Sequence, residues 1–319
     1  MDRQNRANAR IILADSDAYM RQSLLHALTH EGYRDIRSVS RLTLLVDLLR
    51  GSMPDLLIMD IDMADGDAIE LVRDIRNGKI GRNPFLPIIL MSWDSDRPLI
   101  RRVVDSGADM LVAKPLAPVQ LLERMDFIVR QRNPFIVTAD YFGPDRRMDN
   151  SSGEIERYMV PNTLKDKIEG RPVDYASLHE QIQSTFGQMN KLRLVEDAAR
   201  ITSIVGIVTN SYKQKRLSKE TKSRMDQIIC CTEDFAGRIA GTPFESLSGV
   251  CASLLKAARH IHRRPKKADR KQVDLLQPLA DTIRVGVDPD QDSESGIQEV
   301  DHIVDNGRMS APNQPLPQV

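Results

Sequence analysis

Short apolar runs alternate with longer amphipathic stretches between residues 8 and 132 of the chain. The short runs predict buried strands, and the stretches with apolar residues three or four positions apart predict helices. Five strands follow from this pattern, at residues 11–14, 36–39, 56–59, 87–91 and 110–113. Continuous apolar strands separated by helices are typical of a parallel sheet that is covered on both faces. We therefore predict a five-stranded, doubly wound α/β domain over residues 8–132.

The regular pattern lapses between residues 133 and 173, where prolines and glycines interrupt any long element. The segment is nevertheless too apolar for a purely solvated tether. The residues that make it so are Phe135, Ile136, Val137, Tyr141 and Phe142. We predict a linker, part of which forms an arm that packs back on a neighbouring domain.

Residues 174–287 carry apolar stripes at helical spacing, in four successive runs. Each stripe needs a partner face, so the sequence predicts an all-α region that is either a small bundle or a homodimer of helical hairpins. We expect this region to serve output or dimerisation. Residues 288–319 are polar, with several acidic residues and terminal prolines, and they predict a disordered tail.

The overall composition removes some explanations without supplying a function. Lysine plus arginine number 45 and aspartate plus glutamate also number 45, so no global charge favours nucleic acid or an acidic membrane surface. The three cysteines, Cys230, Cys231 and Cys251, lack the spacing of a zinc or disulfide framework and suit a reducing cytoplasm. No signal peptide and no membrane-spanning run is evident, so we expect a cytoplasmic protein that does not contact membranes.

Polar residues stand at the points where the expected strands end. Asp15, Asp60, Ser92 and Lys114 each close or directly follow a strand, and Asp62 comes two residues after Asp60. Ligands of such sheets sit beyond the carboxyl ends of the strands, so we expect these groups to converge at one rim. Clustered carboxylates suit Mg²⁺, which accepts oxygen ligands and keeps several waters. A metal and a lysine together can neutralise a transferring phosphoryl group, and a carboxylate can act as its acceptor.

Four segments then reveal a resemblance to a known family. Residues 11–17 (IILADSD), 54–63 (PDLLIMDIDM), 90–93 (LMSW) and 107–115 (GADMLVAKP) together resemble the receiver domain of bacterial two-component response regulators, in the CheY-like superfamily with a flavodoxin-like fold. The segments have the family's order and spacing over residues 8–132. The helical region that follows resembles no output family.

The resemblance implies a role for each residue of the rim. Asp60 matches the phosphoacceptor, which takes a phosphoryl group from a sensor histidine kinase or a histidine phosphotransfer protein. Asp15 and Asp60, with the backbone carbonyl of Asp62, match the Mg²⁺ ligands. Ser92 matches the hydroxyl that moves toward the phosphoryl oxygen. Lys114 matches the lysine that contacts the phosphoryl group, and its bond to the following proline is expected to be cis.

Two departures from the family pattern bear on this reading. Ser16 stands where the family usually has an aspartate that binds the metal directly, which puts metal affinity in doubt. Asp17 is a substitute candidate for the metal, and Asp15 or Asp17 is also a candidate for the N-cap of the first helix. Leu111 replaces the aromatic residue that many receivers rotate on phosphorylation. Ala64 also replaces a common proline, a minor change.

The sequence therefore favours a non-enzymatic phosphorelay response regulator that signals through protein contacts of its helical region. One alternative is a DNA-binding transcriptional regulator that uses the basic run at residues 259–271, although a solvated loop is the favoured reading and nucleic-acid binding is not expected. A second alternative is a degenerate adaptor that works without phosphorylation. His179, His260 and His262 lack the Lys-Gly setting of a histidine phosphotransfer site and are expected to be ordinary histidines.

Overall fold

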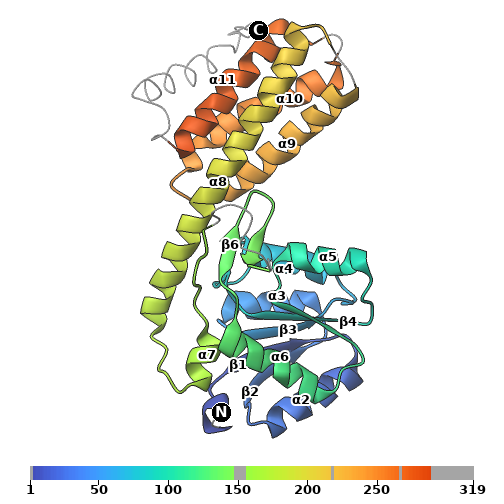
Figure 1. Cartoon of the computed structure of the whole chain (residues 1–319), viewed down its shortest axis with the longest axis vertical. Coiled ribbons are helices and arrows are strands. Elements are labelled where there is room, and N and C mark those ends of the chain that lie inside the picture. The colour runs from blue at the N-terminus through green and yellow to red at the C-terminus, as the bar shows by residue number, and fades with distance from the viewer. Residues whose placement is uncertain (1–2, 147–155, 217–218, 266–267, 289–319) are drawn as a thin grey trace, which may run out of the picture. The chain divides into compact units, whose positions relative to one another are not determined.

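A computed structural model describes residues 3–146, 156–216, 219–265 and 268–288 (Figure 1). The chain divides into two compact units, one from Met1 to Met189 and the other from Asn190 to Val319. The tail expected at residues 288–319 lies, from residue 289 on, outside the described residues.

The first unit is built around one parallel sheet, as the apolar runs predict. Its five strands lie in the order β2-β1-β3-β4-β5, and every pairing among them is parallel. Strands β3 and β4 are buried along their whole length, which explains why their sequences are continuously apolar. The strand bounds are β1 Arg10–Ala14, β2 Asp35–Val39, β3 Leu56–Asp60, β4 Ile88–Ser92 and β5 Met110–Ala113.

Helices cover both faces of the sheet and complete the doubly wound fold. One face packs against α2 and α6, and the other packs against α3, α4 and α5 (Figure 1). The helix bounds are α1 Arg3–Arg6, α2 Ala18–His30, α3 Leu42–Gly51, α4 Ala68–Arg76, α5 Arg97–Ser106 and α6 Pro118–Gln131. The five-stranded α/β fold expected from the sequence is confirmed.

The segment after α6 packs against the sheet domain instead of leading away from it. Strands β6 (Phe135–Val137) and β7 (Phe142–Pro144) form a short antiparallel hairpin. Helix α7 (Thr163–Ile168) adds Leu164 and Ile168 to the core under α6. An aromatic cluster joins Phe85 to Phe135, Phe142 and Phe186, with ring centroids between 5.6 and 6.5 Å apart.

A glycine pair sets how closely the hairpin approaches the sheet. Gly107 ends α5 with a left-handed φ of 83°, and a Cβ built on it would collide with the Phe142 carbonyl oxygen. A Cβ on Gly143 would lie 2.6 Å from the Gly107 Cα. Only glycine tolerates both this backbone conformation and this contact, so the hairpin and the turn before β5 touch backbone to backbone.

The second unit is a helical bundle with a single apolar core. Side chains from the last half of α8 (Tyr175–Lys213) share that core with α9 (Lys219–Ile239), α10 (Ser248–Arg263) and α11 (Arg270–Val287). A 3₁₀ turn, η1 (Glu245–Leu247), leads into α10. The α9 helix stops before Gly241, which has a φ of 71°. The expected helical region is confirmed, and within the described residues no helix is long and apolar enough to cross a membrane.

Candidate functional site

A lysine and two aspartates meet at the carboxyl edge of the sheet. The Lys114 ammonium lies 2.8 Å from Asp15 Oδ2 and 2.9 Å from Asp60 Oδ2. Asp15 follows β1, Asp60 ends β3 and Lys114 follows β5, so three separate strands place them together. All three residues are buried, with relative exposures of 0%, 3% and 5% for Asp15, Asp60 and Lys114. The convergence expected from the strand ends is therefore present.

The electrostatics of this rim follow from its burial. Burial raises the pKa of Asp60, the nearby Asp15 charge adds to that rise, and the contact with Lys114 opposes it. Burial also acts to lower the pKa of Lys114, but its bonds to Asp15 and Asp60 outweigh that effect and leave the pKa above its ordinary value. The lysine thus stays charged and holds two carboxylates that would otherwise repel each other.

Asp60 has one carboxylate oxygen without a partner. Its Oδ1 atom is buried and has no partner at normal hydrogen-bond geometry within the described part of the chain, although the nearby Asp62 amide acts to lower the pKa of this carboxyl. Asp15 differs, because its Oδ1 accepts a hydrogen bond from the Asp17 amide at 2.8 Å while its Oδ2 is held by Lys114. A buried polar atom left unsatisfied costs stability unless something binds it. The rim is therefore an incomplete site with an oxygen available for a ligand.

Ser92 and Ser16 border the two aspartates. Ser92 ends β4, is 1% exposed, and its hydroxyl oxygen accepts a hydrogen bond from the Asp94 amide at 3.0 Å. The Ser16 hydroxyl donates to the Asp62 backbone carbonyl at 3.2 Å. That bond ties the loop after β1 to the loop after β3.

Asp17 takes the role of a helix cap. Its side chain accepts hydrogen bonds from the amides of Tyr19 and Met20 at the start of α2. A carboxylate in this position satisfies free amides of the first turn and interacts well with the helix dipole. Of the two expectations for Asp17, the N-cap is confirmed, and this geometry gives no support to a metal-ligand role.

The donor atoms at the rim fit a weakly held Mg²⁺. The Asp60 carboxylate supplies a hard oxygen donor, and the carbonyl of Asp62 supplies a second. No group of three or more His, Cys, Asp or Glu side chains suited to a metal occurs in the described ranges. Mg²⁺ needs only one or two carboxylates because it keeps waters, so the residues present suffice, with one carboxylate fewer than an aspartate at position 16 would give.

Trp93 is a neighbour of the site that the sequence reasoning did not single out. It directly follows β4, is 55% exposed, and its ring centroid lies 5.7 Å from the Lys114 ammonium. Trp93 could have been recognised from the sequence as a neighbour of the site, because it directly follows Ser92. Trp93 is the single tryptophan of the protein, so its fluorescence reports on this rim.

A second buried charge cluster lies at the opposite edge of the sheet, before β5. Asp109 bonds Arg76 at 2.9 Å and Arg132 at 2.7 Å, and it also accepts from the Ile88 amide at 2.8 Å. Arg76 donates further to the carbonyls of Gly107, Pro84 and Leu86. Burial lowers the pKa of Arg76 to about 10, while Asp109 acts against that shift. Sequence reasoning placed Asp109 in a family segment but assigned it no role.

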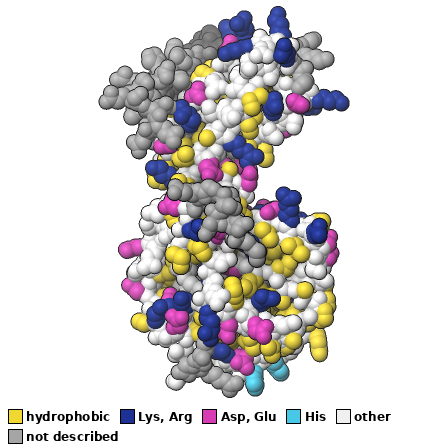
Figure 2. Space-filling view, in the orientation of Figure 1, with side chains coloured by type: hydrophobic (Ala, Val, Ile, Leu, Met, Phe, Trp, Pro, Cys, Tyr) yellow, Lys and Arg dark blue, Asp and Glu magenta, His cyan; other side chains and the backbone are white. Residues whose placement is uncertain are grey.

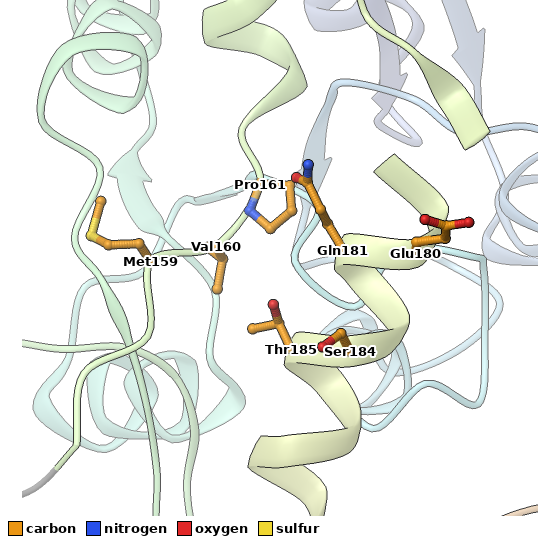
Figure 3. Close-up of a pocket in the computed structure, with 7 residues that line it drawn as sticks. All are labelled: Met159, Val160, Pro161, Glu180, Gln181, Ser184 and Thr185. Carbon is orange, nitrogen blue, oxygen red and sulfur yellow. The ribbon is translucent and has the colours of Figure 1, made fainter. Parts of the chain in front are cut away.

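A surface groove in the first unit does not involve the rim. It has a volume of about 550 Å³ and lies between residues 159–161 and α8 (Figure 3). Its lining residues are Met159, Val160, Pro161, Glu180, Gln181, Ser184 and Thr185. None of the predicted site residues lines it, and it holds a single charged side chain.

The structure also shows the Lys114–Pro115 bond and the surroundings of the other residues that the sequence singled out. The Lys114–Pro115 bond is cis, as the resemblance implies. Leu111 packs partly buried against the core beneath α3, α4 and α5. His179 and His260 are exposed, and His262 lies 2.8 Å from Asp226 Oδ1. Cys230 is exposed, Cys231 is half-buried and Cys251 is buried.

The doubly wound sheet with aspartates and a lysine at its rim can be compared with known protein families. Residues 11–126 match the family model described as "Response regulator receiver domain". The chain therefore contains a response regulator receiver domain of two-component signalling systems, carried by its first unit.

Two relatives from Mycobacterium tuberculosis are similar over this domain. "Transcriptional regulatory protein PdtaR" is 29% identical over 120 residues, which is 38% of this chain and 56% of that protein. "Response regulator MprA" is 30% identical over 127 residues, 40% of this chain and 53% of that protein. The chain spans about half the length of these curated relatives.

Similar solved structures also match a part of the chain. A two-component response regulator from Clostridium difficile is 25% identical with a TM-score of 0.36, covering 40% of this chain and 99% of its own. The chemotaxis response regulator CheY4 of Vibrio cholerae is 21% identical with a TM-score of 0.33, covering 38% and 98%.

Proposed function

We propose that Asp60 accepts a phosphoryl group and that the protein is a phosphorelay response regulator. The observation that carries this proposal is the unpartnered, buried Oδ1 of Asp60, whose other oxygen is held by Lys114. That arrangement leaves one carboxylate oxygen free to attack phosphorus while a fixed positive charge stands beside the reacting group. The donor would be a sensor histidine kinase or a histidine phosphotransfer protein.

The proposed transfer forms one bond to phosphorus and breaks another, with Lys114 and Ser92 beside the reacting group. Asp60 Oδ1 forms a bond to phosphorus as the bond from phosphorus to the donor's imidazole nitrogen breaks, and the electron pair stays on that nitrogen. Lys114, whose ammonium already lies 2.9 Å from Asp60 Oδ2, offsets the charge of the added phosphoryl oxygens. Ser92 can turn its hydroxyl hydrogen toward one of those oxygens, because its oxygen now accepts from the Asp94 amide.

A Mg²⁺ ion would be held by Asp60, by the Asp62 carbonyl and, after rearrangement, by Asp15. When bound, the ion supplies further neutralisation of the transferring phosphoryl group. Asp17 is left out of this set because it caps α2.

We further propose that residues 8–132 form the receiver, residues 133–173 a fixed arm, and residues 174–287 the output region. Protein contacts of the helical unit, including self-association, would carry the response. The aromatic contacts of Phe135 and Phe142 with Phe85 support the assignment of the arm to the receiver side.

Chemical phosphorylation tests the proposal. The full chain is incubated with Mg²⁺ and acetyl phosphate, and the intact mass and the assembly state are recorded. We expect one acid-stable, base-labile phosphoryl adduct in the parent protein and in Asp62→Asn, whose side chain is not needed because only its carbonyl is used. Asp60→Asn should take up none. An unlabelled parent protein, or equal labelling of Asp60→Asn, would leave the phosphorylation-independent adaptor as the better description.

A further inference from the structure

One end of the helical unit is far more basic than the rest of the chain. The described residues of the segments 213–224 and 263–271 include ten Lys or Arg residues and only two acidic residues, in a protein whose formal net charge is zero. Exposed cations in the described part of these segments are Lys213, Lys215, Arg216, Lys219, Lys222, Arg263, Arg264, Arg270 and Lys271. We call this set the basic end. Figure 2 shows dark-blue side chains gathered at this end of the helical unit.

The two segments are far apart in sequence but adjacent in space. One follows α8 and begins α9, and the other follows α10 and begins α11. The Tyr212 hydroxyl donates to the Pro265 carbonyl at 3.1 Å, which ties the two turns together. The basic run at residues 259–271 is therefore only half of a larger surface, and the sequence-based expectation of a solvated loop considered that half alone.

Few of these charges are neutralised by neighbours. Arg270 lies 3.8 Å from Asp274, and Arg224, a half-buried neighbour outside this set, lies 3.9 Å from Glu220. None of the other members of the basic end forms an ion pair with a described residue. Concentrated like charges repel, so such a surface is costly unless an anionic partner binds it.

The end of α8 adds an independent observation. Lys215 has a φ of 57°, and it is the one non-glycine residue with positive φ in the described ranges. Its amide and that of Arg216 bond back to the carbonyls of Tyr212 and Ser211, which is the usual closing turn of a helix. Glycine is the favoured residue at this position. A lysine here keeps a strained backbone while adding a charge to the basic end.

The surroundings of the basic end narrow the class of partner. The exposed large apolar side chains of the helical unit lie outside these segments, at Leu192, Ile207 and Leu275. An amphipathic helix binds a bilayer surface through apolar side chains that insert beside the charges, and single strands are bound through exposed aromatic rings. Neither feature is present among the described residues of the segments. A duplex backbone, with its dense line of phosphates, needs only cations.

We propose that the basic end binds the phosphate backbone of duplex DNA. Contacts of this kind position a protein on DNA without reading its sequence. The surface belongs to the helical unit alone, so the inference goes beyond the phosphoacceptor chemistry and does not depend on it.

Anisotropy of a fluorescent DNA duplex mixed with the full chain tests the proposal. We expect binding at about 50 mM salt that weakens roughly a hundredfold or more at about 200 mM, because counterions are released. The variant Lys215→Glu/Arg216→Glu/Arg263→Glu/Arg264→Glu should weaken binding at least about thirtyfold at the lower salt. The matched control Arg34→Glu/Arg37→Glu/Arg97→Glu/Arg101→Glu changes net charge equally on the receiver and should weaken it less than about threefold.

The variant Lys215→Gly separates a loss of DNA binding from a loss of folding. It removes one charge while placing the favoured residue at a left-handed position, so it should melt at a higher temperature and yet bind DNA more weakly, about threefold or more. Absent binding at the lower salt, or an equal loss in the receiver control, would overturn the proposal. Tighter binding of an RNA duplex or of anionic phosphatidylglycerol vesicles would overturn the choice of DNA.

Discussion

Two buried charge clusters occupy opposite edges of the same sheet, and they differ in how completely they are bonded. At the amino edge, Asp109 engages two arginines and a backbone amide, and Arg76 also donates to three backbone carbonyls. At the carboxyl edge, Lys114 holds two aspartates, but Asp60 keeps an oxygen without a partner. A fully bonded cluster holds the fold together, whereas an incomplete one is suited to take a ligand.

Replacing an aspartate by asparagine at each edge should give the largest difference in the free energy of unfolding. Asp109→Asn leaves two buried guanidinium groups without their carboxylate and should lower the free energy of unfolding by about 3 kcal/mol. Asp60→Asn should alter it by less than about 1 kcal/mol, because burial and Asp15 already disfavour that charge and Lys114 keeps Asp15 as its partner. Urea unfolding followed by circular dichroism measures both values. Similar losses in the two variants would remove the distinction between the clusters.

Glycine substitutions test whether the β6–β7 hairpin contacts the turn before β5 closely enough to affect the free energy of unfolding. Gly107→Ala should cost about 2 kcal/mol or more, because it combines a left-handed backbone with a collision against the Phe142 carbonyl. Gly81→Ala is the matched control, since Gly81 has a φ of 80° but its nearest neighbour would be 3.7 Å away. That change should cost about 1 kcal/mol. Equal unfolding midpoints for the two variants would mean that the hairpin does not press on the turn before β5.

The affinity for Mg²⁺ should change when residues at the carboxyl edge of the sheet are substituted. Ser16→Asp adds a carboxylate beside Asp60 and should tighten Mg²⁺ binding about tenfold, which corresponds to about 1.4 kcal/mol. Ser16→Ala only removes the hydrogen bond to the Asp62 carbonyl and should change the affinity less. Trp93 fluorescence during a Mg²⁺ titration gives the dissociation constants. An unchanged constant in Ser16→Asp would place the ion somewhere other than this rim.

The rim was predictable because its geometry follows from chain direction alone. Parallel strands bring their carboxyl ends to one edge, so Asp15, Asp60 and Lys114 had to converge once the apolar runs were recognised as strands. The part played by Asp17 was not decided by sequence, because a carboxylate two residues past a strand suits a helix cap and a metal equally well. Only the direction of its side chain, toward the amides of Tyr19 and Met20, separates the two.

The arginine cluster was missed, and only the half of the basic end at residues 259–271 was found, for a different reason. Arg76 sits on a helix pattern where arginine is usually solvated, and its partner Asp109 is 33 residues away. Likewise, the two basic segments become one surface only through the Tyr212–Pro265 contact across 53 residues. Periodicity reports which face of an element is apolar, but it does not say which polar side chains from distant elements will meet.

Helix α8 has a practical consequence for dissecting the protein. Its 39 residues place Leu178, Ile182 and Met189 in the aromatic cluster of the first unit and Leu194 and Ala198 in the core of the second. A protease cut or a cloning boundary inside α8 would strip one of the two cores of side chains that it needs. Halves made separately should therefore overlap, each retaining the whole of Tyr175–Lys213.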